Sequence, residues 1–219
     1  MKPFLFLPGK TFPILFVSMC LFFACTSKEV KVACVGDSIT EGYGLAVQSK
    51  TGYPVVLNRI LGDNYSVLNL GRSATTLQKH GDFPYWICKE FSDVFAYKPD
   101  IIVIKLGTND TKPQNWNQDN YKNDYQALID TFKTISTNPK IYLCLPVPAF
   151  KTRWGINDST VVHGVIPVIK ELAAKNDLPV IDLYDDMSDQ GADFFDSIHP
   201  NEEAAKVMAG FIAKAIKTK

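Results

Sequence analysis

Five short apolar runs, each followed by a segment with helical patterning, constrain the fold of this chain more than any other feature of its sequence. The runs cover residues 31–35, 65–69, 101–106, 141–145 and 179–183. Runs that are apolar at nearly every position are typical of strands buried on both faces, as in a parallel sheet. The intervening patterns predict helices over residues 52–62, 84–97, 119–136, 160–176 and 201–217. This alternation predicts an α/β fold, a three-layer α/β/α sandwich with a five-stranded parallel sheet.

The N-terminus has the order of parts that is typical of a bacterial export signal. Lys2 and Lys10 precede or flank the start of an apolar run over residues 12–24, and no acidic residue stands before it. This run is shorter than the roughly 20 residues that a membrane-spanning helix needs, and it matches the apolar part of a signal peptide. We therefore predict a signal peptide over residues 1–24; the alternative is a buried N-terminal strand or helix.

The sequence Ala24-Cys25 is similar to the lipobox of bacterial lipoproteins, in which the cysteine is acylated and becomes the mature N-terminus. Two or more acyl chains anchor a protein stably, whereas a single chain binds a membrane weakly. We expect an exported protein anchored to a membrane through Cys25, in the periplasm or at the cell surface, or secreted if Cys25 is not acylated. Residues 25–30 are then a tether and residues 31–219 a single domain.

Charge and cysteine content exclude several classes of protein. The chain has 23 basic and 23 acidic residues, and without residues 1–24 the balance is 21 basic to 23 acidic. Such a balance offers no positive field to a polyanion, so we expect no nucleic-acid partner. The five cysteines form no Cys-x-x-Cys pair and no cluster with histidine, so we predict no metal site and no disulfide framework. The sequence sets no oligomeric state.

Ser38 stands where the first predicted strand passes into a helix. Residues 36–42 read Gly-Asp-Ser-Ile-Thr-Glu-Gly and follow the first apolar run directly. A serine at this place is exposed, and the amides of a helix N-terminus can stabilise an oxyanion. A plain strand-to-helix turn capped by Ser or Asp has the same pattern, so Ser38 alone does not decide between a nucleophile and a cap.

Asp196 and His199 lie within one turn before the last predicted helix, and Asn109 follows the third predicted strand. A serine hydroxyl needs a base within hydrogen-bond reach, and the base needs a carboxylate that sets its tautomer. All of these segments leave the carboxyl ends of strands, the edge where ligands bind in an open α/β sheet. We therefore expect the sheet to bring Ser38, His199 and Asp196 together.

Four sequence blocks, in this order, resemble the SGNH or GDSL-type serine hydrolases. They are GDSITEG at 36–42, NLGRSATTL at 69–77, KLGTNDT at 105–111 and DSIHPN at 196–201. The resemblance implies the flavodoxin-like fold of that family over residues 31–219 and an esterase that needs no cofactor. It also implies that Ser38 is the nucleophile, His199 the general base and Asp196 its orienting acid. The oxyanion hole would include the backbone N–H of Ser38 and the side-chain amide of Asn109.

The third oxyanion donor departs from the pattern of the family. Members usually have glycine five residues after the asparagine of the second block, and this chain has Ala74 there, counted from Asn69. Alanine keeps the N–H group but disfavours a positive φ, which leaves the backbone conformation at Ala74 open. Gly71 is the poorer alternative donor, because it lies only two residues after Asn69.

Three loops near the inferred site combine aromatic and polar residues, and they contain Trp86, Trp116 and the pair Arg153-Trp154. Aromatic faces suit the C–H faces of sugars, and an arginine can bind the carboxylate of an acidic sugar in a bidentate manner. The alternative for each tryptophan is packing within its own loop. We predict that these four residues contact substrate.

These loops and the GDSITEG block are also similar to the secreted carbohydrate acetylesterases of the family. We therefore predict an exported esterase that removes O-acetyl groups from glycans through an acyl-enzyme intermediate. Its partners would be a small-molecule or glycan ester and the membrane that holds Cys25. Two alternatives stay open: a lysophospholipase- or thioesterase-type acyl hydrolase, and a catalytically silent glycan-binding lipoprotein.

Overall fold

The computed structural model describes residues 1, 3 and 28–218. Cys25 and nearly all of the predicted signal peptide over 1–24 lie outside the described residues, as do residues 25–27 of the predicted tether over 25–30. Within the described part of the chain, no helix combines the length and the apolar character needed to cross a membrane.

Five parallel strands form one sheet in the order β2-β1-β3-β4-β5. The strands are β1 (Val30–Gly36), β2 (Tyr65–Gly71), β3 (Ile101–Lys105), β4 (Lys140–Cys144) and β5 (Val180–Ile181). In the central strand β1, Val32 and Val35 are fully buried together with the residues between them, as a strand covered on both faces requires. The five-stranded parallel sheet predicted from the apolar runs is confirmed.

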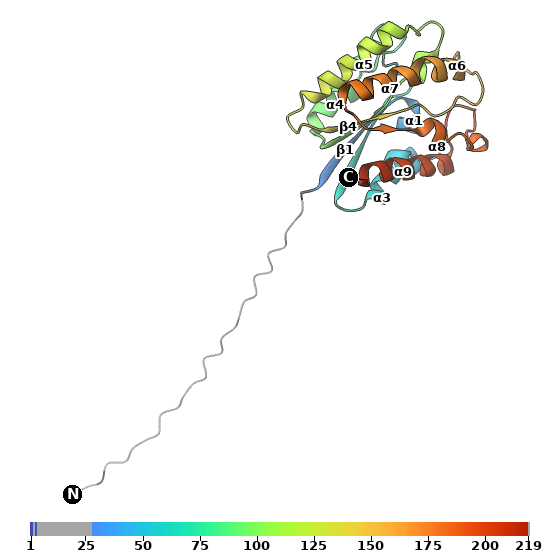
Figure 1. Cartoon of the computed structure of the whole chain (residues 1–219). Coiled ribbons are helices and arrows are strands. Elements are labelled where there is room, and N and C mark those ends of the chain that lie inside the picture. The colour runs from blue at the N-terminus through green and yellow to red at the C-terminus, as the bar shows by residue number, and fades with distance from the viewer. Residues whose placement is uncertain (2, 4–27, 219) are drawn as a thin grey trace.

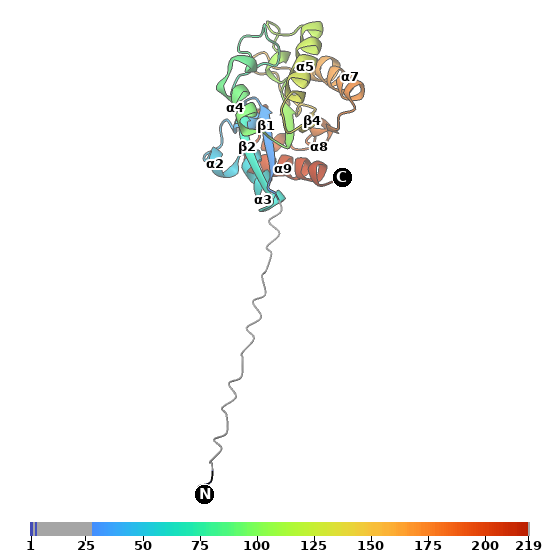
Figure 2. The same ribbon diagram turned by 90° about the vertical axis from the view of Figure 1, so that its left-hand side faces the viewer.

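Helices cover both faces of this sheet (Figure 1). One layer contains α3 (Tyr53–Leu61) and α9 (Glu202–Lys217), and the other contains α4 (Lys89–Tyr97), α5 (Gln118–Lys133) and α7 (Ile166–Asn176). The view turned by 90° shows the same two layers on either side of β1, β2 and β4 (Figure 2). The predicted three-layer α/β/α sandwich is thus confirmed.

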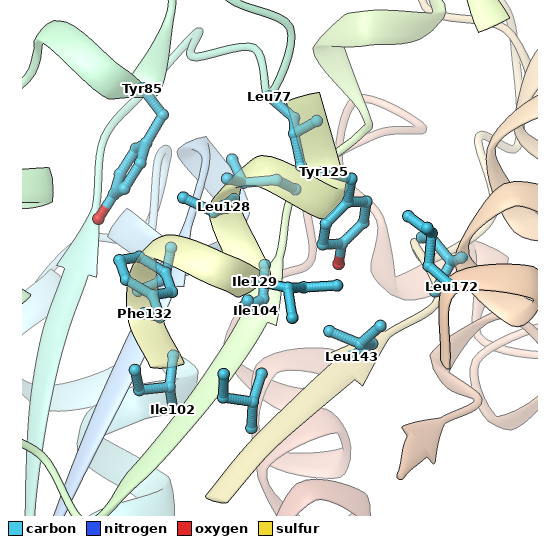
Figure 3. Close-up of a cluster of buried hydrophobic side chains, with 14 of the residues drawn as sticks. Leu77, Tyr85, Ile102, Ile104, Tyr125, Leu128, Ile129, Phe132, Leu143 and Leu172 are labelled. Carbon is cyan, nitrogen blue, oxygen red and sulfur yellow. The ribbon is translucent and has the colours of Figure 1, made fainter. Parts of the chain in front are cut away.

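The larger of the two core layers lies between the sheet and α4, α5 and α7. Figure 3 shows some of its side chains, among them Ile129 and Phe132 of α5 and Ile104 of β3. These residues are at most 1% exposed. Since each fully buried side chain of this size contributes about 1.5–3 kcal/mol, this layer holds the sheet and its helices in one arrangement.

Short elements lie in the connections, most of them near the carboxyl edge of the sheet. They are α1 (Ser38–Glu41), α2 (Gln48–Thr51), η1 (Tyr85–Ile87), η2 (Asn109–Thr111), α6 (Asp158–Thr160), η3 (Val161–Val165), α8 (Leu183–Asp186) and η4 (Gly191–Asp193). η3 is a π-helical segment that joins α6 to α7, so the helix predicted over 160–176 is continuous but irregular in its first turns.

Two predicted elements differ from the structure. The last strand, predicted over 179–183, ends at Ile181, because the side chain of Asp182 accepts the backbone N–H of Asp185 and begins α8. The helix predicted over 84–97 is interrupted at Cys88, whose backbone is extended, and α4 begins only after it.

Candidate active site

Ser38, His199 and Asp196 form a hydrogen-bonded chain at the carboxyl edge of the sheet. Ser38 Oγ lies 2.9 Å from His199 Nε2, and His199 Nδ1 lies 2.7 Å from Asp196 Oδ2. Ser38 is 7% exposed, His199 5% and Asp196 8%, so these hydrogen bonds are largely shielded from water. Ser38 and His199 nevertheless line a pocket that is open to solvent. A hydroxyl, an imidazole and a carboxylate in this order can transfer a proton from the serine to the histidine.

The end of β1 places Ser38 by close packing and by a helix cap. Asp37 accepts the backbone N–H of Ile39 through its side chain at 3.0 Å, which makes it the N-cap of α1 and Ser38 the first helical residue. Gly36 permits the tight turn, because a Cβ atom there would lie 2.0 Å from Thr40 Oγ1 and 2.8 Å from the Lys105 carbonyl oxygen.

The loop before α9 holds His199 and Asp196 in place. Asp196 Oδ1 accepts the backbone N–H groups of Ile198 at 3.0 Å and of His199 at 2.7 Å. Asn201 caps α9 by accepting the backbone N–H of Ala204 at 3.0 Å, which ends the loop two residues after the histidine.

The same hydrogen bonds set the charge of Asp196. Burial raises the pKa of its carboxyl group, but the hydrogen bonds from the backbone and ring of His199 and from the backbone of Ile198 outweigh burial and leave the pKa below its ordinary value. Because the folded-state pKa is lowered, this carboxylate stabilises the fold above its ordinary pKa and loses that effect as the pH falls through the lowered value. An ionised Asp196 accepts a hydrogen bond from Nδ1–H of His199, which leaves Nε2 to accept a hydrogen bond from the Ser38 hydroxyl.

Three possible oxyanion donors border one pocket of about 330 Å³, which Ser38, Ala74 and Asn109 line together with His199. Asn109 Nδ2 donates to the Thr75 carbonyl oxygen at 3.1 Å, which orients the amide and uses one of its two hydrogens. Ala74 has φ +66°, so it adopts the left-handed conformation that its sequence left open. The structure therefore brings the three predicted donor residues to one pocket with the serine and histidine.

Glu41 and Ser73 hold the loop that carries Ala74. The carboxylate of Glu41, in the last turn of α1, accepts the backbone N–H of Ser73 at 2.8 Å and also the hydroxyl of Ser73. At Gly71 a Cβ atom would lie 2.2 Å from the Glu41 backbone nitrogen, so the end of β2 approaches α1 more closely than any side chain permits. These contacts compensate for the unfavourable backbone of Ala74.

We expect Ala74→Gly to raise the free energy of unfolding by about 0.5–1 kcal/mol, because glycine adopts a positive φ without the steric penalty of a Cβ atom. Ala74 is exposed, so little packing is lost. Chemical denaturation measures the change. The matched control is Ala174→Gly in the exposed face of α7, which should lower stability by about 1 kcal/mol. If Ala74→Gly lowered the free energy of unfolding as much as Ala174→Gly, the positive φ of Ala74 would not be unfavourable.

A buried ion pair joins the strand ends that carry Ser38 and Asn109. Lys105 Nζ lies 3.0 and 3.2 Å from the two carboxylate oxygens of Asp37, and it donates to Thr108 Oγ1 at 3.0 Å. The two charged side chains are 1% and 0% exposed. Because Lys105 ends β3 and Asp37 follows β1, the pair fixes the spacing between these neighbouring strands at the edge of the site.

Asp110, next to Asn109, has a structural role at the same edge. Its carboxylate oxygens each accept a backbone N–H at 2.9 Å, from Leu77 and from Gln78. Burial raises the pKa of Asp110 to about 6 in spite of these bonds. The bonds attach the loop after Ala74 to η2.

The predicted substrate-contacting residues divide into two groups. Trp154 lines the pocket, and its ring centroid lies 5.8 Å from that of His199. Arg153 is exposed, with its guanidinium 4.5 Å from the centre of the Trp154 ring, and is not itself among the residues that line the pocket.

Trp86 and Trp116, by contrast, do not line this pocket. Trp86 Nε1 donates to the Leu77 carbonyl oxygen at 2.8 Å, and its ring packs against Phe91. Trp116 packs against Tyr121. Both side chains are partly buried and pack against the core layer that contains α4 and α5, as the packing alternative for a loop tryptophan predicts.

Sequence reasoning missed two aromatic residues at the mouth of the site. Tyr43 lines the pocket, with its ring centroid 4.7 Å from that of His199, and the ring of Phe195 stacks on His199 at 6.0 Å. A signal existed for both, because Tyr43 directly follows the GDSITEG block and Phe195 directly precedes Asp196. Among the residues that the structure describes, no group of three or more His, Cys, Asp or Glu side chains could hold a metal ion.

A hydroxyl, an imidazole and a carboxylate in hydrogen-bonded order beside a pocket form the arrangement that is typical of serine hydrolases, and here it lies on an α/β/α sandwich. Residues 34–207 match the GDSL-like Lipase/Acylhydrolase family. The chain belongs to this family.

Similar proteins include an acetylxylan esterase of Xylanibacter ruminicola, which is 42% identical over 207 residues. The match covers 86% of this chain and 43% of that protein, so the chain spans less than half the length of this relative. Two solved structures share the fold. The aryl esterase of M. smegmatis has a TM-score of 0.71 at 20% identity and covers 86% of this chain and 99% of its own. Est24, a carbohydrate acetylesterase from Sinorhizobium meliloti, has a TM-score of 0.71 at 21% identity, covering 86% and 98%.

Proposed function

We propose that this protein hydrolyses O-acetyl esters on carbohydrates through an acyl-enzyme intermediate. One observation carries the proposal. Ser38 and His199, whose Oγ and Nε2 atoms lie 2.9 Å apart, line the same pocket as Ala74 and Asn109. A nucleophile, its base and its oxyanion donors thus border one space that an ester can enter.

The reaction follows from the positions of these groups. Ser38 Oγ attacks the ester carbonyl carbon while His199 Nε2 accepts the hydroxyl proton, and Asp196 stabilises the resulting imidazolium. The carbonyl oxygen becomes an oxyanion that accepts hydrogen bonds from the backbone N–H groups of Ser38 and Ala74 and from the amide of Asn109. His199 then protonates the departing alcohol. Water, deprotonated by His199, attacks the acyl-enzyme, releasing the acid and restoring Ser38.

Two observations support acetyl as the acyl group and a carbohydrate as the alcohol. A protein 42% identical to this chain is named an acetylxylan esterase, and a carbohydrate acetylesterase shares the fold. The pocket is small, about 330 Å³, and Ala74 and Ile156 are its aliphatic lining residues. The aromatic rings of Tyr43 and Trp154 add apolar surface, but a long acyl chain needs a more continuous aliphatic surface than these side chains offer.

The experiment that tests the proposal compares acyl-chain lengths. We expect kcat/KM on 4-nitrophenyl esters to fall by roughly tenfold or more from acetate to octanoate, and acetate to be released from acetylated xylan. A preference for octanoate would favour the lysophospholipase- or thioesterase-type alternative. Binding of acetylated xylan without release of acetate would favour the silent glycan-binding alternative.

We also propose that the protein is exported and held at a membrane by an acylated Cys25. β1 begins at Val30 and Ser38 follows its other end, so a tether before residue 30 would join the sheet at the edge opposite the pocket. An anchor there would leave the pocket facing away from the membrane. The intact mass of the exported protein tests this proposal, because cleavage before Cys25 and its acylation change the mass in a defined way.

A further inference from the structure

Three exposed aromatic rings surround His199. The ring centroids of Tyr43, Trp154 and Phe195 lie 4.7, 5.8 and 6.0 Å from that of the imidazole. These side chains are 46%, 52% and 52% exposed, and they are the exposed large aromatic residues of the described part of the chain. An aromatic ring in water leaves its apolar surface unburied, so the gathering of all three at one histidine points to a ligand that covers them.

Trp154 lies in a turn whose backbone conformation is strained. Trp154 has φ +51° and Gly155 φ +81°, and they form a two-residue turn closed by hydrogen bonds between Arg153 and Ile156 in both directions, at 3.1 and 2.9 Å. A bulky residue rarely adopts a positive φ, and such strain gathers at functional sites. The turn therefore presents Trp154 at its tip.

Phe195 is placed by a second device. Gly44 has φ +80°, and a Cβ atom at this position would lie 2.2 Å from the Phe195 ring. Any other residue at position 44 would displace the ring from His199. The Phe195 ring thus packs against the backbone of Gly44 beside the imidazole, although the residue is 52% exposed.

The position of His199 in the reaction indicates which part of the ester these rings contact. His199 delivers a proton to the departing alcohol oxygen, so the alcohol part must lie on the side of His199. The carbonyl oxygen must instead face the amides of Ala74 and Asn109. Since the three rings contact His199, they meet the alcohol part of the ester and not the acyl part.

We infer that Tyr43, Trp154 and Phe195 form the subsite for the alcohol part of the substrate, and that its ligand is a pyranose ring. This inference rests on the proposed ester hydrolysis. Flat aromatic faces match the C–H faces of a pyranose, and the exposed guanidinium of Arg153, 4.5 Å from the Trp154 ring centre, supplies donors for hydroxyl groups. A fatty alcohol would need a continuous aliphatic groove in place of separate rings and donors.

The test compares two acetyl esters that differ only in the alcohol: a monoacetylated methyl xylopyranoside and ethyl acetate, whose alcohol is too small to span the rings. We expect Trp154→Ala to lower the ratio of kcat/KM for the sugar ester to that for ethyl acetate by about tenfold, mainly through KM. Trp154→Phe, which keeps an aromatic face, should recover most of the ratio. The matched control is Ile87→Ala, which removes another exposed apolar side chain away from the pocket and should leave the ratio unchanged.

The outcomes separate the subsite from the activity. Equal losses on both esters in Trp154→Ala would overturn the subsite, because the ring would then act only through His199. A changed preference between acetyl and butyryl esters of the same sugar, with an unchanged alcohol ratio, would also overturn it by placing the ring beside the acyl group. Failure of the unaltered enzyme to hydrolyse either ester would instead refute the proposed function itself.

Discussion

Replacement of Ser38 by alanine is expected to lower kcat for 4-nitrophenyl acetate hydrolysis by about 10⁴- to 10⁶-fold. The variant lacks the oxygen that lies 2.9 Å from His199 Nε2, so no acyl-enzyme can form. The remaining rate would come from the oxyanion donors and from binding alone. Initial rates measure the loss, with circular dichroism to show that the fold is retained.

Three further variants test the same assignment. Asp196→Asn should lower kcat by roughly 10⁴-fold, because an amide at 2.7 Å from Nδ1 no longer holds the imidazole in the required tautomer. Ser38 and Asp196 act in the same step, so the double variant Ser38→Ala/Asp196→Asn should be about as slow as Ser38→Ala alone. Ser92→Ala is the matched control: this exposed hydroxyl in α4 bonds only to the Lys89 carbonyl oxygen, and the rate should not change. If Ser38→Ala kept more than about a hundredth of the rate, another nucleophile would be required.

Replacement of Lys105 by methionine is expected to lower the free energy of unfolding by about 3–5 kcal/mol. The ammonium group is buried and lies 3.0 and 3.2 Å from the Asp37 carboxylate oxygens, so its loss leaves a buried carboxylate without a counter-charge. Thr108 would lose its donor as well. Urea denaturation of the variant and the unaltered protein measures the difference.

The controls for this prediction separate burial from charge. Lys89→Met breaks the Lys89–Asp93 pair, whose lysine side chain is 80% exposed, and should change stability by no more than about 0.5 kcal/mol. Adding Asp37→Asn to Lys105→Met should recover part of the loss, because a neutral amide can still accept the Ile39 N–H without an unpaired charge. If Lys105→Met and Lys89→Met had equal effects, the buried pair would not hold the strand ends together.

The roles of Ser38 and Lys105 differ in how far they could be predicted from the sequence. Ser38, Asp196 and His199 stand in short blocks whose residue types carry the chemistry, and the block with Ser38 directly follows an apolar run that could be assigned to a strand. Lys105 lies near the end of the apolar run over residues 101–106, and its sequence context does not distinguish it from an exposed lysine at the edge of the sheet. Its partner Asp37 lies 68 residues away, and nothing local indicates that the two are buried together.

The tryptophans show the same division within a single residue type. Trp86, Trp116 and Trp154 all stand in loops with polar neighbours, and the sequence treats them alike. Trp86 and Trp116 turn inward onto α4 and α5, whereas Trp154 is carried outward by a turn with two positive φ angles. The direction of a loop side chain depends on the surface beneath the loop, and that surface is built from distant segments.

By itself the sequence determined the α/β/α layers, the edge of the sheet that carries the site and the residue types of its chemistry. These follow from local properties: hydrophobic periodicity specifies strands and helices, and parallel strands place their carboxyl ends at one edge. Tertiary structure alone decided the left-handed backbone of Ala74, the buried pair of Asp37 and Lys105 and the aromatic rings around His199. Each of these depends on contacts between segments far apart in the chain, where packing and burial select conformations and charge pairs that local sequence preferences disfavour.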